Sequence, residues 1–209
     1  MRRREMPMPE VSAERSARER IIGAAREHFF AHGFHNVTMD DLSDVLGMSK
    51  RTIYGQFPTK TALLEALLLD KFRRAEQELE AITSECSGDF AAGLHRLLAC
   101  VQGQTEEVRP PFLRDVQRDA PELFKVVQAR RREVIQRQFG KLLGAGRREG
   151  LIRKDVPVHL IIEILLGAVE AIVNPPRLAE LELSPKTAIT TIISVILAGA
   201  LTTEGRAKL

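Results

Sequence analysis

Apolar residues recur along most of the chain at the three- and four-residue spacing of an amphipathic helix. No run alternates convincingly between apolar and polar residues as a half-buried strand does, and Gly and Pro fall mostly between the periodic segments. The pattern therefore predicts an all-α protein. Helices are expected at residues 12–32, 38–47, 49–57, 59–83, 90–106, 111–118, 122–148, 157–173 and 185–203.

Residues 38–57 comprise two of these short helices joined by the three-residue turn GMS. Thr38 and Ser49 can cap the two helix starts, and Gly47 supplies the tight turn because only Gly takes a positive φ cheaply. The small Ser43 lets the helices cross closely. The apolar face of the first helix is expected to be Leu42, Val45 and Leu46, and the residues with the spacing to meet inside the elbow are Leu42, Leu46, Met48 and Ile53. This is a helix-turn-helix, in which the second helix enters the major groove of DNA.

The second of the two helices explains the composition of the stretch SKRTIYGQFPTK, residues 49–60. Ile53 and Phe57, four residues apart, are expected to face inward. That leaves Lys50, Arg51, Tyr54 and Gln56 pointing outward. These side chains offer donors for phosphates or base edges, although a tyrosine in a short helix is also compatible with a place in the core.

The segments AAREHFFAHGF, residues 24–34, and VTMDDLSDVLGMSKRTIYGQFPTKTALL, residues 37–64, resemble the tetracycline-repressor (TetR) family. The match covers about the first third of the chain, and the remainder agrees in length and helical character. Leu46 stands where the family frequently has Ala, and Arg51 stands where it frequently has Gly, which adds a long donor. The residues that carry the motif are Thr38, Met39, Gly47, Ser49, Lys50, Arg51, Thr52, Ile53, Tyr54, Phe57 and Lys60.

The resemblance implies a homodimeric, all-helical transcription regulator, usually a repressor, that binds an inverted-repeat operator in double-stranded DNA. A small-molecule effector in the C-terminal domain would change the spacing of the two DNA-binding domains, so that they no longer match the operator. No cofactor is expected. Tyr54 and Lys60 would hold phosphates, and the recognition helix would read bases. The implied DNA-binding residues are Thr38, Ser49, Lys50, Arg51, Thr52, Tyr54, Gln56 and Lys60.

The expected organisation has four parts. A flexible N-terminal arm at residues 1–11 precedes the helix-turn-helix domain at 12–60. A connecting helix at 61–84 leads to a helical effector-binding and dimerisation domain at 85–209, and SECSGD, residues 84–89, is the expected internal boundary. The helices at 157–173 and 185–203 are apolar on nearly all sides, so one side of each is expected to face a partner chain. The candidate interface residues are Ile164, Val169, Ile193 and Leu197.

Composition and charge restrict the class of protein but do not identify its function. Hydrophobic residues make up 44% and charged residues 28%, which is ordinary for a globular protein. The net charge of +3 does not by itself indicate nucleic acid, and residues 1–84 carry 13 basic and 13 acidic side chains. Only the stretch 47–60 is cleanly basic, with three cations and no acid. The two cysteines, the lack of a signal-like apolar segment and the lack of a long apolar run favour a cytoplasmic protein with reduced thiols and no membrane partner.

The effector pocket is the least constrained part of the sequence. His95, Gln102, Phe112, Phe124 and Glu163 are its candidate lining. The polar stripe of His159, Glu163 and Glu170 is compatible with exposure to solvent, with a dimer contact or with a cavity wall. The run 130–132 of three arginines leaves open a solvated face or a second nucleic-acid site.

Other chemistries find little support in the sequence. His28, His32 and His35 have a spacing that suits metal, but they lack the HExxH arrangement and also suit a helix end, so no metal site is expected. No nucleophile and base can be paired, so an enzyme is the weaker hypothesis. A constitutive DNA-binding regulator without an effector stays as the alternative.

Overall fold

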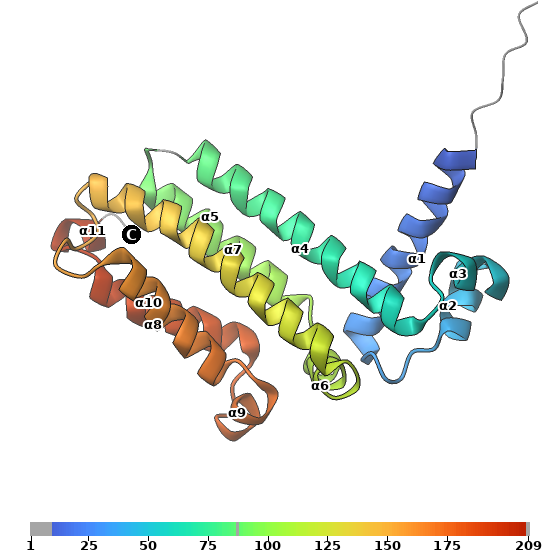
Figure 1. Ribbon diagram of the computed structural model, residues 1–209. Coiled ribbons are helices and arrows are strands. Elements are labelled where there is room, and N and C mark those ends of the chain that lie inside the picture. The colour runs from blue at the N-terminus through green and yellow to red at the C-terminus, as the bar shows by residue number, and fades with distance from the viewer. Residues whose placement is uncertain (1–9, 87, 208–209) are drawn as a thin grey trace, which may run out of the picture.

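The computed structural model describes residues 10–86 and 88–207, and in that part the chain forms eleven helices and no strand (Figure 1). Their bounds are α1 Glu10–His32, α2 Met39–Leu46, α3 Lys50–Gln56, α4 Lys60–Glu85, α5 Phe90–Glu106, α6 Pro110–Asp119, α7 Pro121–Arg148, α8 Val158–Ile172, α9 Pro175–Glu180, α10 Pro185–Ala200 and α11 Thr203–Ala207. The all-α prediction is confirmed. Within these residues, no helix combines the length and apolarity needed to cross a bilayer.

The predicted helices are all present, with shifts at their ends. The helix expected from Ser12 begins at Glu10, so the described chain is already helical inside the arm predicted at 1–11, while residues 1–9 lie outside the described part. The last long helix was predicted to run to residue 203 but ends at Ala200, because Leu201 is extended and forms an isolated antiparallel bridge with Ile152.

Two short helices were missed by the sequence pattern. The helix α9 starts at Asn174, whose side chain accepts a hydrogen bond from the backbone N–H of Arg177 at 3.1 Å. The helix α11 follows Thr202, whose hydroxyl accepts from the backbone N–H of Gly205 at 3.0 Å. Segments of this length contain too few turns for hydrophobic periodicity to appear.

The apolar side chains form two cores along an elongated molecule (Figure 1). The first core joins α1, α2, α3, the start of α4 and, from the C-terminal part, Phe112, Val116 and Ala120 of α6 and its end. The second joins the end of α4 to α5, α7, α8 and α10. The helix α4 therefore belongs to both cores, with Leu68 in the first and Leu79 in the second.

The segment expected as a boundary, residues 84–89, is the turn between α4 and α5, which pack against each other. Because α4 and α5 form a hairpin of neighbours, this turn lies within the C-terminal helical bundle. The change from one core to the other occurs inside α4, between Leu68 and Leu79, and so before residues 84–89.

Candidate DNA-binding interface and ligand cavity

Local hydrogen bonds define the elbow formed by α2 and α3. The hydroxyl of Thr38 accepts from the N–H of Asp41 at 3.1 Å, and the Asp41 carboxylate accepts from the N–H of Thr38 at 2.7 Å, which completes a capping box. The hydrogen bond that the Thr38 N–H donates to the carboxylate is the main cause that lowers the pKa of Asp41. Gly47 ends α2 with φ 60, and Ser49 caps α3 by accepting from the N–H of Thr52 at 3.1 Å.

The interior of the elbow follows the predicted pattern with one exception. Leu42 and Ile53 are fully buried, and Leu46 and Met48 pack partly buried against the same core. The buried hydroxyl of Ser43 donates to the carbonyl of Met48 and so fixes the turn. The exception is Val45, which was expected on the apolar face but is 56% exposed. The buried face of α2 runs through Met39, Leu42 and Ser43, and Val45 lies beyond its edge.

The outward side of α3 carries most of the predicted DNA-binding residues. Lys50, Arg51, Thr52 and Tyr54 are exposed, Gln56 is partly exposed, and the inward positions Ile53 and Phe57 are buried. Tyr54 is 45% exposed, so it is not a core residue of this chain. A short helix thus presents a guanidinium, an ammonium, hydroxyls and an amide on one side.

The cations of this surface are not equivalent. In the described part of the chain no hydrogen bond or ion pair holds the guanidinium of Arg51. Lys50 Nζ lies 2.6 Å from Asp40 Oδ2, and the hydrogen bond to Asp40 raises the pKa of Lys50. The stretch 47–60 has no acid in its sequence, but the fold places the acid of α2 beside it.

Lys60 is less available than expected. Its ammonium donates to the carbonyl of His35 at 3.2 Å and lies 4.4 Å from the centre of the Phe34 ring. Burial lowers the pKa of Lys60, and the carboxylates of Asp119, Asp115 and Asp41 oppose that shift. A phosphate contact by Lys60 requires this side chain to leave the aromatic ring.

Two exposed arginines of α1 flank the elbow and were missed by the sequence reasoning. Arg18 donates to the carbonyl of Gln56 at 3.3 Å and covers the Phe57 ring at 4.3 Å, so it sits at the C-terminal end of α3. Arg20 donates to the carbonyl of Leu46 at 3.3 Å, at the end of α2. Both positions favour a cation because of the helix dipole. The sequence shows that α1 carries basic residues, but it does not show that they contact the ends of α2 and α3.

A cavity of about 220 Å³ lies inside the helical bundle, between α4, α5, α6, α7, α8 and α10. Its wall is almost entirely apolar, and it includes the predicted residues Phe112 and Phe124. Gln102 lies outside this wall, where its amide donates to the Thr190 hydroxyl at 3.2 Å. His95 and Glu163 are exposed on the surface and do not line the cavity.

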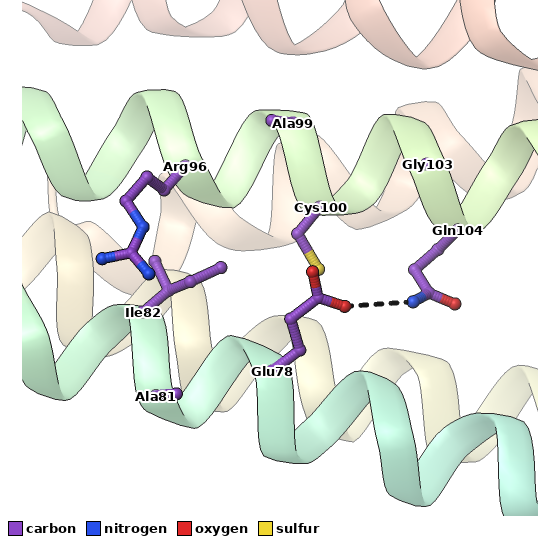
Figure 2. Close-up of a pocket in the computed structure, with 8 residues that line it drawn as sticks. All are labelled: Glu78, Ala81, Ile82, Arg96, Ala99, Cys100, Gly103 and Gln104. Carbon is purple, nitrogen blue, oxygen red and sulfur yellow. Dashed lines mark hydrogen bonds between the residues drawn. The ribbon is translucent and has the colours of Figure 1, made fainter.

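A shallower hollow of about 410 Å³ lies between α4 and α5 (Figure 2). Figure 2 shows the Cys100 sulfur beside the Glu78 carboxylate, with the Gln104 amide donating to Glu78 at 3.3 Å. Burial, reinforced by Glu78, raises the pKa of Cys100 to about 12. Cys100 belongs to the walls of both this hollow and the cavity inside the bundle, and its thiol is neutral at physiological pH.

The predicted interface and stripe residues occupy distinct environments. Ile164 is 50% exposed, whereas Val169, Ile193 and Leu197 are buried within the C-terminal core of a single chain. The stripe of α8 faces solvent: His159, Glu163 and Glu170 are exposed, and Arg132 pairs with both glutamates. In the described residues, no three His, Cys, Asp or Glu side chains are grouped as a metal site.

The comparisons with known proteins agree with this architecture. The family model described as "Bacterial regulatory proteins, tetR family" matches residues 21–67, which run from α1 through the elbow into α4. Among solved structures, a TetR transcription regulator from Haloarcula marismortui has a TM-score of 0.71 at 22% identity, covering 90% of this chain and 100% of that chain. Residues 21–67 therefore match the TetR-family model, and the chain as a whole shares the fold of that solved TetR regulator.

Among the other similar proteins, one matches a short part of the chain and two match most of it. UidR from Escherichia coli K12, a HTH-type transcriptional regulator, is 40% identical over 58 residues, which is 28% of this chain and 30% of that protein. The transcriptional repressor Rv1474c from Mycobacterium tuberculosis is 26% identical over 183 residues, covering 82% of this chain and 93% of that protein. SmeT, the repressor of a Stenotrophomonas maltophilia multidrug efflux pump, shares the fold with a TM-score of 0.63 at 19% identity, covering 89% and 91% of the two chains. The chain thus spans less than a third of the UidR proteins that it matches.

Proposed function

We propose that this protein is a homodimeric DNA-binding transcriptional regulator, a repressor that a small-molecule effector releases from its operator. The observation that carries the proposal is the outward side of α3, where Arg51, Thr52 and Tyr54 are exposed on a helix whose other side is fixed in the core. Phosphate and base-edge acceptors are complementary to these donors. The absence of a nucleophile–base pairing in the sequence favours a binding role over an enzymatic one, and the expected location is the cytoplasm.

Apolar residues on α8 and α10 support a homodimer. Leu160 and Ile164 of α8 are 45% and 50% exposed, and Val195 of α10 is 66% exposed. The two helices pack against each other, so their exposed sides can form one surface (Figure 1). A two-fold dimer through this surface would present two copies of α3 to an inverted-repeat operator.

The cavity inside the bundle favours control by an effector rather than constitutive DNA binding. One of the solved structures with this fold is a complex of SmeT with triclosan, so a protein of this fold can take a small molecule. In this chain the cavity wall reaches the DNA-binding domain through Phe112, whose ring packs edge-on against Phe30 of α1 at 4.8 Å between centroids. A ligand that moves Phe112 would therefore act directly on α1.

An ion-pair network makes a second connection between the cavity and α1. The wall residue Lys71 of α4 bonds the carboxylate of Glu107, and Arg26 of α1 bonds the same carboxylate. Burial tends to raise the pKa of Glu107, but the hydrogen bonds from Arg26 and Lys71 outweigh it and lower that pKa. Displacement of Lys71 by a ligand would remove one of the two partners that hold Glu107 against α1.

A titration of labelled duplex DNA tests the proposal. The duplex carries an inverted repeat from the DNA that flanks the gene, and a scrambled duplex of the same composition is the control. We expect tighter binding to the inverted repeat by about a thousandfold or more, and a logarithmic salt slope near −0.9 for each phosphate neutralised. Equal and salt-independent binding to both duplexes would contradict a role as a DNA-binding regulator.

A further inference from the structure

The charged and polar side chains in the cavity wall are nearly all held by other groups of the protein. Lys71 donates to Glu107 and to Gln104 Oε1 at 2.9 Å. Thr105 donates its hydroxyl to the Val101 carbonyl at 2.7 Å. Glu107 therefore neutralises the charge of Lys71, so Lys71 adds no net charge to the cavity wall.

Arg131 of α7 is the exception. It lines the cavity, yet in the described part of the chain no hydrogen bond or ion pair reaches its guanidinium. Its two neighbours behave differently, since Arg130 pairs with Glu76 at 3.1 Å and Arg132 with Glu170 at 3.0 Å. The three arginines therefore do not form one continuous surface for solvent or nucleic acid, because the middle one, Arg131, lines the cavity.

The surroundings of Arg131 leave its positive charge poorly compensated. Burial lowers the pKa of Arg131, and the carboxylate of Glu170 opposes the shift from a distance, since that carboxylate is already bonded to Arg132. A guanidinium nevertheless stays protonated in proteins. A desolvated charge without a partner is costly, and a carboxylate that pairs with it in two parallel hydrogen bonds removes that cost.

We propose that the cavity binds an organic monocarboxylate with an apolar body, and that Arg131 holds its carboxylate. The single uncompensated cation selects one negative charge, while Phe112, Phe124 and the aliphatic wall accept the apolar body. This inference rests on the proposed function in one respect only, namely that the cavity is an effector site. It concerns the class of the effector and is measured on the protein without DNA.

Pairs of ligands that differ only in charge provide the test. Butanoate, octanoate and dodecanoate are compared with the alcohols of the same chain length by calorimetric titration of the full-length protein. At least one carboxylate is expected to bind more tightly than its alcohol by about tenfold or more, the discrimination typical of a hydrogen bond to a charged group. If every alcohol binds as tightly as its carboxylate, or if no carboxylate binds, the inference is wrong.

Substitutions then assign the preference to one side chain. Arg131→Met keeps the length and removes the charge, and it is expected to reduce the preference for the carboxylate to about twofold or less while the alcohol still binds. Arg130→Met, at the neighbouring position on the surface, is the matched control and should keep the preference of the parent. A preference that survives Arg131→Met, or that is lost equally in Arg130→Met, would refute the role of Arg131.

Thermal unfolding without ligand separates this role from a structural one. Replacement of a partly buried, unpaired cation by a residue of similar volume should leave the melting temperature unchanged or raise it. A marked fall in Arg131→Met would mean that Arg131 is a structural cation balanced by Glu170, and the proposal would fall. Because no DNA is present, either outcome leaves the operator titration as an independent test of the proposed function.

Discussion

At the scale of the residue, three cations on or near α3 lie in three different environments. Arg51 has no partner in the described chain, Lys50 is paired with Asp40, and Lys60 is folded over the Phe34 ring. A side chain that has no partner within the protein breaks no existing hydrogen bond or ion pair when it binds another group. Arg51 is therefore the cation of this surface that is readiest to contact a base edge.

The first prediction is that Arg51→Ala relaxes base preference at one position in each half-site. Arg matches the two acceptors of guanine in the major groove, and such a pair discriminates by ~1–3 kcal/mol. Affinity for random DNA should stay nearly unchanged. The measurement is a binding-site selection on the parent, on Arg51→Ala and on Arg148→Ala, an exposed cation at the far end of α7. Equal stringency in the parent and in Arg51→Ala, with weaker binding overall, would make Arg51 a backbone contact.

A second prediction concerns the two thiols. The raised pKa of Cys100, about 12, leaves its thiol protonated at neutral and mildly alkaline pH, and Cys100 is buried. Cys86 is partly exposed. Iodoacetamide should therefore label the native protein at Cys86 only, and Cys86→Ser should abolish native labelling while Cys100→Ser leaves it intact. Both thiols should react after denaturation, and rapid labelling of Cys100 in the folded protein would show that its surroundings are open.

At the scale of the element, the contact between α5 and α7 depends on a glycine. A Cβ atom placed on Gly146 would lie 2.5 Å from Cδ2 of Phe90, whose ring is 1% exposed. A Cβ atom on Gly144 of the same helix would have Nη1 of Arg148 as its nearest neighbour, at 3.9 Å. One glycine of α7 is thus required by packing, and the other is not.

The third prediction compares these two glycines. Gly146→Ala should lower the free energy of unfolding by about 1–3 kcal/mol, because an extra carbon in a filled core forces the Phe90 ring to shift. Gly144→Ala should raise it by up to ~1 kcal/mol, because Ala favours a helix over Gly. Urea denaturation at one fixed protein concentration measures both. If Gly146→Ala is as stable as the parent, the ring moves without cost and the close approach of α5 and α7 is not required.

At the scale of the whole molecule, α8 and α10 each have one side in the core and another that carries exposed apolar residues. The buried side includes Val169 and Ile193, and the exposed side includes Ile164 and Val195. The two helices are apolar on nearly all sides in sequence, and the fold places part of that apolar surface in the interior and part on the outside. Assembly and folding can therefore be disturbed separately.

The fourth prediction uses this division. The parent should sediment as a dimer at micromolar concentration, and Ile164→Glu should yield folded monomers because it places a charge in the proposed interface. Ile193→Glu should instead prevent stable folding, with a cost of about 3–5 kcal/mol, because Ile193 is 4% exposed. Leu69→Glu, at an exposed position of α4, is the control and should stay dimeric. A monomeric parent would overturn the dimer proposal.

The sequence by itself determined the longer helices and the elbow that carries the proposed DNA contacts, but not the short helices α9 and α11. Capping by Thr38 and Ser49, the stop at Gly47 and the inward side of Ile53 and Phe57 all depend on residues within one or two turns of each other. Interactions of such short range can be predicted from the local sequence alone. For the same reason the exposure of Arg51 and Tyr54 could be predicted before any tertiary contact was known.

Only the tertiary structure decided which of the remaining polar residues matter. Arg130, Arg131 and Arg132 are equivalent in sequence, but successive residues of a helix point about 100° apart, so packing sends only Arg131 toward the cavity. Lys50 and its partner Asp40 come from different helices, and Arg26 of α1 pairs with Glu107, which follows the end of α5. Such pairs depend on how helices dock, and docking is set by the apolar faces of both partners together, which no local pattern specifies.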